Sequence, residues 1–219
     1  MKLKIQNKKI DKRNILSTTS KIKFIVGIDE VGRGPLAGPI AVGVFKMPID
    51  FIAKGFGKVK DSKKLMPEKR QEIFEKLTKL KKENQVDFQV CFETARRIDR
   101  LGLTKTTQNC LEEALGKLEI KPEECTILLD GGLKAPKEYK NQKTIIKGDE
   151  KERSIAFASI VAKVSRDTLM CKLSKKYPKY LFDVHKGYGT KTHRELIKKN
   201  GLSLEHRKTF CKNLLKKIN

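Results

Sequence analysis

Carboxylates follow apolar segments at three places in this otherwise strongly basic chain. Asp29 and Glu30 come directly after FIVGI, Asp130 follows CTILL, and Asp149 follows TIIKG. If the three segments are neighbouring strands of one sheet, their ends bring these carboxylates together, at the edge where open α/β sheets place their active sites. Gathered carboxylates repel one another unless protons or cations intervene. Such oxygen donors favour Mg²⁺ or Mn²⁺, and two such ions about 4 Å apart suit the hydrolysis of a phosphodiester.

The pair of adjacent acids raises a geometric difficulty. Neighbouring residues of a regular strand point to opposite faces of the sheet, so Asp29 and Glu30 cannot both reach one metal pair from it. Gly27 and Gly32 flank the pair and would allow the backbone to bend or bulge there. The alternative is that Glu30 contributes from the following turn. Acids also end strands by chance, so the three segments together carry the prediction better than any one of them.

The turn that follows, GRGPLAG at 32–38, suggests contact with a polyanion. A dinucleotide-binding loop does not fit, because its glycine spacing differs, Pro35 removes an amide donor, and a strand follows where a helix should begin. We favour a glycine turn that brings backbone amides against a sugar–phosphate chain, with Arg33 as a charged contact. An ordinary hairpin-like turn remains the alternative.

Periodicity along the chain predicts an α/β fold with a mixed sheet. The first two strands are predicted to be antiparallel, because the turn between them is too short for a helical crossover. Residues 1–21 are predicted to be a flexible basic arm, 22–180 a catalytic domain and 181–219 a basic helical region. The expected strands are 21–29, 38–47, 85–93, 126–130 and 143–149; the expected helices are 67–83, 94–119 with an interruption near Gly102, 152–177 with small residues for close packing, and segments near 191–199 and 207–217.

The composition favours a nucleic-acid partner. Fifty Lys and Arg against 26 Asp and Glu give a formal charge of +24, and a protein with such an excess gains from counterion release on binding phosphates. A lysine-rich genome is the alternative explanation. No run of about 18 apolar residues is present. The basic N-terminal segment is not followed by an apolar core, so we expect no secretory signal peptide. The five cysteines are dispersed without a CxxC pair, which predicts reduced thiols and a cytoplasmic protein without a membrane partner.

Several longer motifs resemble one family closely, the type 2 ribonucleases H, called ribonuclease HII. The resemblance implies a ribonuclease H-like fold, with a central mixed sheet flanked by helices and a C-terminal helical region. It implies metal-dependent cleavage of the RNA strand of RNA/DNA hybrids and of single ribonucleotides in duplex DNA, leaving 3′-hydroxyl and 5′-phosphate ends. The N-terminal arm is too short for the extra domain of the sister type, ribonuclease HIII. The motifs are GIDEVGRGPLAGP (27–39), DSKKL (61–65), LLDGG (128–132), KGD (147–149), SIVAKVSRDTLM (159–170), YPKYLFDVHKGYGTKTH (177–193) and EHRKTF (205–210).

The same resemblance assigns roles to individual residues. It implies that Asp29, Glu30, Asp130 and Asp149 are catalytic and bind Mg²⁺ or Mn²⁺, as two ions when substrate is bound. It implies that Gly32, Arg33 and Gly34 read the ribose 2′-hydroxyl, and that Tyr188 stacks on the sugar at an RNA–DNA junction. Lys63, Lys163 and Arg166 match phosphate or active-site contacts. We expect a monomer, and a replication-associated partner stays open. The alternatives are that Tyr188 is a plain surface aromatic, that Lys63 is solvated, and that Lys163 and Arg166 cap and solubilise a helix.

Some segments depart from the pattern of the family, and two other functions remain as rivals. Gly102 replaces a common asparagine and is expected to weaken its helix by about 1 kcal/mol. The LKAP segment puts a phosphate contact near Lys134 in doubt. His185, His193 and His206 are expected to be structural or phosphate contacts and not metal ligands. The rival functions are another ribonuclease H-like nuclease, such as a resolvase or transposase, and a basic RNA-binding protein without activity.

Overall fold

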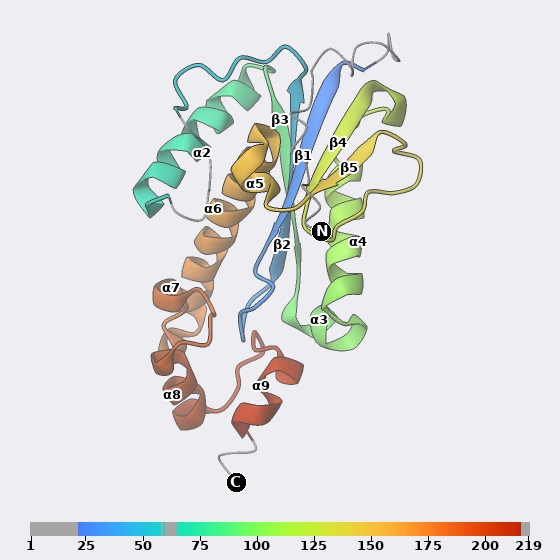
Figure 1. The fold of residues 1–219 in the computed structure, drawn as a ribbon. Coiled ribbons are helices and arrows are strands. Elements are labelled where there is room, and N and C mark those ends of the chain that lie inside the picture. The colour runs from blue at the N-terminus through green and yellow to red at the C-terminus, as the bar shows by residue number, and fades with distance from the viewer. Residues whose placement is uncertain (1–21, 58, 60–64, 216–219) are drawn as a thin grey trace, which may run out of the picture.

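A five-stranded mixed sheet forms the centre of the computed structural model, which describes residues 22–57, 59 and 65–215 (Figure 1). The strand order is β3-β2-β1-β4-β5. β1 and β2 pair antiparallel, as predicted, and β3 pairs antiparallel with β2. β1, β4 and β5 run parallel to one another. The predicted arm at 1–21 lies outside the described residues. The strands are β1 Phe24–Val31, β2 Ile40–Pro48, β3 Asp87–Glu93, β4 Cys125–Asp130 and β5 Gln142–Ile145.

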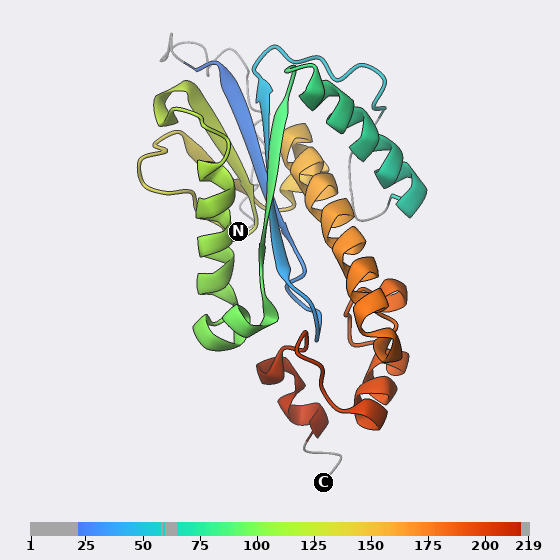
Figure 2. The ribbon, with the colours of Figure 1, turned by 180° about the vertical axis from the view of Figure 1, so that it is seen from behind.

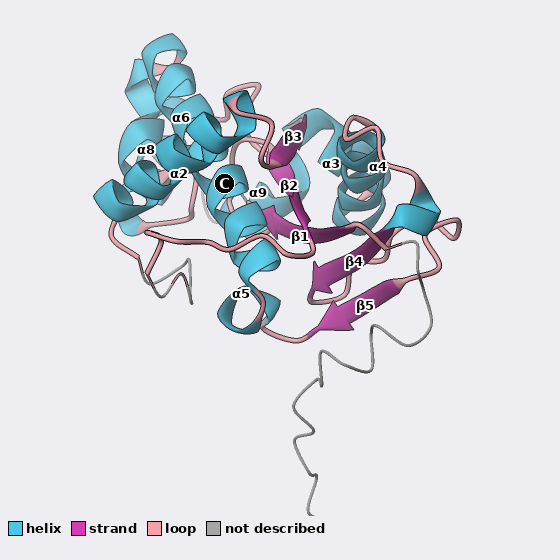
Figure 3. Cartoon of the chain, turned by 90° about the horizontal axis from the view of Figure 1, so that it is seen from above, coloured by secondary structure: helices cyan, strands magenta, loops and turns pink. Residues whose placement is uncertain are grey.

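Helices cover both faces of the sheet. α3 (Ala95–Leu101) and α4 (Leu103–Gly116) lie on one face, while α2 (Pro67–Lys82) and α6 (Arg153–Lys176) lie on the other (Figures 2 and 3). Alternate residues of β1 serve the two faces: Val26 and Ile28 pack in the core beneath α4. The core beneath α6 includes Phe45 of β2, whose ring centroid lies 5.0 Å from that of Phe157. The predicted mixed α/β architecture is confirmed.

The long helix α6 packs closely on β1 and β2 because two strand residues lack side chains. A Cβ atom on Gly27 would lie 2.1 Å from the backbone carbon of Ser154, and one on Gly43 would lie 2.4 Å from the carbonyl oxygen of Ala158. The small residues of α6 therefore allow the close packing that the sequence predicts. The short helix α5 (Gly148–Lys151) immediately precedes α6, so this packing also sets where Asp149 lies.

Two local expectations are corrected. Gly102 lies between α3 and α4 with φ +77°, a left-handed conformation that glycine adopts readily, so the expected cost of a helical glycine does not apply. The segment at 143–149 is not one strand ending in an acid. β5 ends at Ile145, Lys147 adopts φ +53°, and Asp149 belongs to α5.

The C-terminal region packs against the segment between β1 and β2. Ala37 forms an isolated antiparallel bridge with His206, and it shares a small buried cluster with Met170, Tyr180 and Phe182. No helix of the described residues is long and apolar enough to cross a membrane. The remaining helical elements are η1 Pro122–Glu124, η2 Pro178–Tyr180, α7 Phe182–His185, α8 Lys191–Asn200 and α9 Lys208–Leu215.

Candidate active site

Three of the predicted acids meet at the carboxyl ends of two neighbouring parallel strands. The β1–β4 register ends with Ile28 opposite Leu129, so the next residues along the two strands are Asp29 and Asp130. The backbone amide of Gly148 donates a 2.8 Å hydrogen bond to Oδ1 of Asp130, which ties α5 to the end of β4. Asp149, the following residue, is buried. Tertiary structure thus brings Asp29, Asp130 and Asp149 to one edge from three elements.

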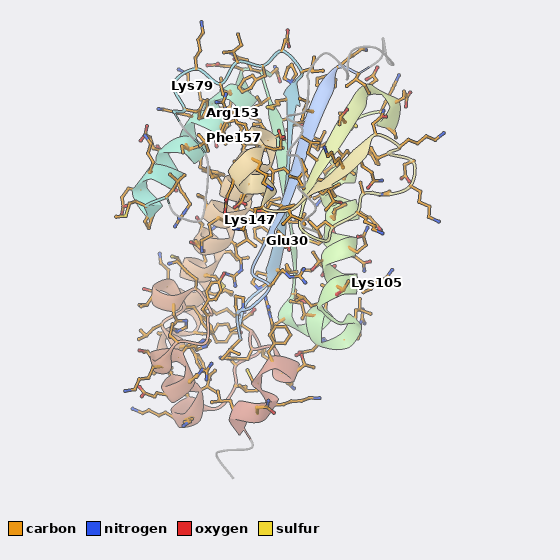
Figure 4. All side chains as sticks on the ribbon, viewed as in Figure 1. Glu30, Lys79, Lys105, Lys147, Arg153 and Phe157 are labelled. Atoms are coloured by element: carbon orange, nitrogen blue, oxygen red, sulfur yellow. The ribbon has the colours of Figure 1, made fainter. Side chains whose placement is uncertain are left out.

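Glu30 approaches this edge differently from Asp29. β1 pairs with β2 without a bulge, with Asp29 opposite Gly43 and Glu30 opposite Val42. The bulge that the glycines would allow is not formed, Glu30 belongs to the strand and not to the turn, and the two acids point to opposite faces. β4 pairing stops one residue before Asp29, which leaves this end of β1 open on the β4 side. Both acids therefore lie at the end of β1, beyond its last pair with β4, on opposite faces of the strand. Figure 4 labels Glu30 on β1 and Lys147 just before α5.

Backbone and side-chain donors orient the acids of β1. The amide of Glu30 donates to Oδ1 of Asp29 at 2.8 Å. Arg33 donates from Nη1 to Oε1 of Glu30 at 3.3 Å, and because the guanidinium is half exposed, this ion pair is screened by solvent. The glycine turn is thereby linked to the acid pair that precedes it.

The donor chemistry of this edge suits a hard divalent cation. Carboxylate oxygens are the ligands that Mg²⁺ and Mn²⁺ prefer. Among the described residues, no three His, Cys, Asp or Glu side chains form a group that could hold a metal ion as they stand. The acids are therefore neighbouring donors at one edge and not a closed coordination shell, which agrees with the repulsion expected between carboxylates.

The predicted substrate-reading residues lie beside each other. The amide of Leu36 donates to the carbonyl oxygen of Gly187 at 2.8 Å, which ties the glycine turn to the Tyr188 loop. Tyr188 is 40% exposed. Its ring centroid lies 5.9 Å from Nζ of Lys163, which also pairs with Asp167 at 2.9 Å. Tyr188 and Lys163 therefore flank one surface next to the turn. Lys63 lies outside the described residues.

Arg166 does not have the role that the sequence predicts. Its side chain is fully buried and donates to the carbonyl oxygens of Pro39, Lys186 and Ala37 at 2.9, 3.1 and 3.4 Å. With its donors directed inward, it cannot contact a substrate phosphate in this arrangement. The position of Arg166 also accounts for the glycine at position 32, because a Cβ atom there would lie 2.4 Å from Nε of Arg166. The φ of Gly32, +96°, favours glycine as well.

Arg207 is a residue that sequence reasoning missed. It is also fully buried, and it donates to the carbonyl oxygens of Gly32, Arg33 and Gly38 at 2.6, 2.8 and 3.1 Å. Burial, followed by the nearby Arg166 charge, lowers the pKa of Arg207 to about 9. It therefore stays protonated near neutral pH. The one signal in the sequence was its place inside the EHRKTF motif.

The three histidines form a buried cluster, which agrees with the structural alternative. Nε2 of His193 lies 3.1 Å from Nε2 of His206, and the rings of His185 and His193 stack with centroids 4.0 Å apart. His193 contacts the carbonyl oxygen of Tyr188 through Nδ1 at 2.9 Å. Burial lowers the pKa of all three, to about 4 for His193 and His206. The cluster is neutral at pH 7 and holds the Tyr188 loop.

Comparison with solved structures first defines the class of this fold. The chain is similar to the ribonuclease H2 of Pyrococcus horikoshii OT3, with a TM-score of 0.67 and 27% identity, over 89% of this chain and 98% of that one. It is also similar in fold to Bst-RNase HIII in complex with Mn²⁺, with a TM-score of 0.70 and 22% identity, over 91% and 71% of the two chains. The fold is that of the type 2 and type 3 ribonucleases H.

Sequence comparison then gives the family. The family model of Ribonuclease HII matches residues 26–215. The chain is 44% identical over 193 residues to the ribonuclease HII of Caldicellulosiruptor bescii, covering 88% of this chain and 89% of that protein. It is 48% identical over 189 residues to that of Prochlorococcus marinus (strain MIT 9215), covering 85% and 89%. The chain belongs to the ribonuclease HII family.

Membership confirms the resemblance and decides between the rival functions. The protein is a ribonuclease H, an endonuclease that hydrolyses RNA in RNA/DNA hybrids. Neither a resolvase, a transposase nor an inactive RNA-binding protein fits that assignment.

Proposed function

We propose that this ribonuclease H cuts at single ribonucleotides within duplex DNA as well as in RNA/DNA hybrids, leaving 3′-hydroxyl and 5′-phosphate ends. The observation that carries the proposal is the proximity of two substrate-reading elements to the acids. The Gly32–Gly34 turn begins two residues after Glu30, at the end of β1. The Tyr188 loop accepts a hydrogen bond at Gly187 from the amide of Leu36, shortly after this turn.

Divalent cations are part of the proposal. The residues that would hold them are Asp29, Glu30, Asp130 and Asp149, because these acids lie at or next to the carboxyl ends of β1 and β4. When bound, two Mg²⁺ or Mn²⁺ ions would offset the carboxylate charge and supply Lewis-acid stabilisation of the attacking and leaving oxygens. A solved relative of the same fold, Bst-RNase HIII, is in complex with Mn²⁺, which supports this choice of cofactor.

The chain's own residues would bind and orient the nucleic acid. The exposed Arg33 and Gly34 offer a charged side chain and backbone amides to the ribose and its phosphates. Tyr188 offers a partly exposed ring, and Lys163 a nearby cation, on the adjoining surface. A 2′-hydroxyl distinguishes RNA from DNA, so a turn that approaches the sugar closely can select a ribonucleotide.

Partners beyond nucleic acid stay predictions. The ribonuclease HII of Archaeoglobus fulgidus, which is similar in fold with a TM-score of 0.65 and 24% identity over 84% of this chain and 93% of that one, was solved in a complex with PCNA. That likeness supports the fold of this chain and leaves a replication-associated partner open. Separately, we propose that the protein acts on duplex substrates as a monomer.

The Tyr188→Ala variant tests the proposal. It should reduce cleavage at a single embedded ribonucleotide more than cleavage within a continuous hybrid, because stacking on the 3′ deoxyribose is available at the RNA–DNA junction. Stacking is worth roughly 1–3 kcal/mol, so the ratio of the two cleavage rates should shrink about tenfold or more.

Tyr188→Phe is the matched control, because it keeps the ring and should keep the ratio. An equal loss on both substrates would make Tyr188 a general positioning residue. Failure of the unmodified protein to cut the embedded ribonucleotide would reject the proposed specificity.

A further inference from the structure

Two buried arginines hold the backbone of the glycine turn from its inner side. Arg166 and Arg207 are both 0% exposed, and all six of their hydrogen bonds within the described residues go to backbone carbonyl oxygens. Five of these carbonyls belong to residues 32–39, and the sixth belongs to Lys186, close to Tyr188. Buried charge is retained in proteins only where strong acceptors surround it. The turn supplies those acceptors.

The direction of these carbonyls decides the direction of the neighbouring amides. In a planar trans peptide the C=O and N–H groups point to opposite sides, and the described residues contain no cis peptide. The carbonyls of Gly32 and Arg33 share their peptide units with the N–H groups of Arg33 and Gly34. Because Arg207 draws both carbonyls inward, both N–H groups point away from the interior.

These two amides are available to a ligand. Arg33 and Gly34 are exposed, and a Cβ atom on Gly34 would meet nothing within 4 Å. Neither amide donates a hydrogen bond to another residue of the described part of the chain. Consecutive N–H groups that point to one side form a small site for an oxygen acceptor. A ribose 2′-hydroxyl is such an acceptor, and a deoxyribose lacks it.

We propose that Arg207 is a specificity-determining positioning residue: by holding the Gly32 and Arg33 carbonyls inward, it presents the Arg33 and Gly34 amides to the 2′-hydroxyl of the substrate. Arg166 supports the same turn by donating hydrogen bonds to the carbonyl oxygens of Ala37 and Pro39. Its hydrogen bond to the carbonyl oxygen of Lys186 connects the turn to the Tyr188 loop. The role rests on the proposed function, in which this turn contacts the ribose.

The Arg207→Lys variant separates this role from a general contribution to the fold. Lysine keeps the charge but lacks the planar fork of donors that spans several carbonyls. Binding should be measured by fluorescence anisotropy, without divalent metal, for a DNA duplex with one ribonucleotide and for the matched all-DNA duplex. The preference of the unmodified protein for the ribonucleotide duplex should fall about tenfold in Arg207→Lys, while affinity for the all-DNA duplex is kept. KM for the ribonucleotide duplex should rise accordingly.

Arg100→Lys is the matched control, because Arg100 is an exposed arginine of α3; its preference should equal that of the unmodified protein. Equal loss of affinity for both duplexes in Arg207→Lys, or an unchanged preference, overturns the role of Arg207. A wild-type protein that binds both duplexes equally rejects the proposed function and this role together, so the two failures are distinguishable.

A measurement on the unmodified protein covers the case in which Arg207→Lys does not fold. The Arg33 and Gly34 amide resonances should shift when the ribonucleotide duplex is added, and should shift much less with the all-DNA duplex. Resonances that respond equally to both duplexes overturn the proposal.

Discussion

Asp29 and Asp130 occupy equivalent places on parallel neighbours, and a backbone amide orients each of them. The amides of Glu30 and Gly148 hold one oxygen of each side chain at 2.8 Å. An asparagine at either position keeps an oxygen for that amide and loses the negative charge. Asparagine substitution at either position therefore separates the effect of the negative charge on cleavage from the effect of the local geometry.

We predict that Asp29→Asn and Asp130→Asn each abolish cleavage and keep the fold. Losing a carboxylate from a metal-dependent site removes several kcal/mol of transition-state stabilisation, which is a rate loss of about a hundredfold or more. Stability should hold or rise, because one repulsive charge is removed. Cleavage with Mg²⁺ or Mn²⁺ and thermal unfolding measure the two effects.

The exposed Asp50→Asn is the control for a charge change elsewhere and should cleave normally. Near wild-type cleavage by Asp29→Asn or Asp130→Asn would remove that acid from the active site.

At the scale of elements, the packing of α6 on β1 positions the third acid. Gly27 lets the start of α6 approach the strand, and α5 with Asp149 directly precedes α6. The hydrogen bond from Gly148 to Asp130 completes this connection between strand ends and helix. A side chain at Gly27 would therefore disturb the fold and the site together.

The Gly27→Ala variant should lose about 3 kcal/mol or more of unfolding free energy, because its Cβ atom would overlap backbone atoms of Ser154. Its cleavage rate should fall as well, because α5 must move. Urea unfolding and cleavage of a hybrid measure these effects. Gly116→Ala, at the end of α4 with nothing within 4 Å of its Cβ, should be neutral or stabilise by up to about 1 kcal/mol. Similar unfolding free energies for both variants would contradict this account.

At the scale of the whole molecule, the C-terminal region packs on the glycine turn of the candidate site and is more than a source of positive charge. His206 and Arg207 are buried against the segment between β1 and β2. A truncated variant without residues 205–219 would lose both residues, and the glycine turn would be disturbed. Any loss of nucleic-acid affinity in that variant could therefore not be assigned to the lost positive charge alone. The three histidines of the chain all belong to the buried cluster in this region.

We predict that the protein loses stability between about pH 6.5 and pH 4. Burial lowers the pKa of His193 and His206 to about 4 in the folded protein, whereas both titrate near 6.5 when unfolded. The unfolded chain therefore binds more protons in this window, and the free energy of unfolding falls as pH falls. Each histidine contributes on the order of 3 kcal/mol at most. Urea unfolding at pH 7 and pH 5 tests this.

No other histidines exist in the chain, so titration between pH 7 and 5 reports mainly on this cluster. The His193→Gln variant should have a weaker pH dependence in that interval. An unfolding free energy that stays constant from pH 7 to pH 5 would contradict the prediction.

The sequence by itself determined those features that depend on residues close together in the chain. The alternation and length of apolar segments predicted the mixed sheet, and a short turn required β1 and β2 to be antiparallel. Glycine in a helical stretch marked the break at Gly102. The acids were found because a charge after a buried strand is visible in the sequence, although their grouping depended on the assumption that the strands are neighbours.

Tertiary structure decided which charges are exposed and which are buried. Arg166 and Arg207 read as surface cations in a basic chain, yet five of their six carbonyl partners lie 127 to 175 residues away. The unbroken register of β1 with β2 keeps Asp29 and Glu30 on opposite faces, where the flanking glycines had left a bend or bulge open. The neutral histidine cluster likewise forms from three separate segments. The physical reason is that burial of a polar group is favourable only when distant backbone supplies its hydrogen-bond partners, and no local pattern encodes that supply.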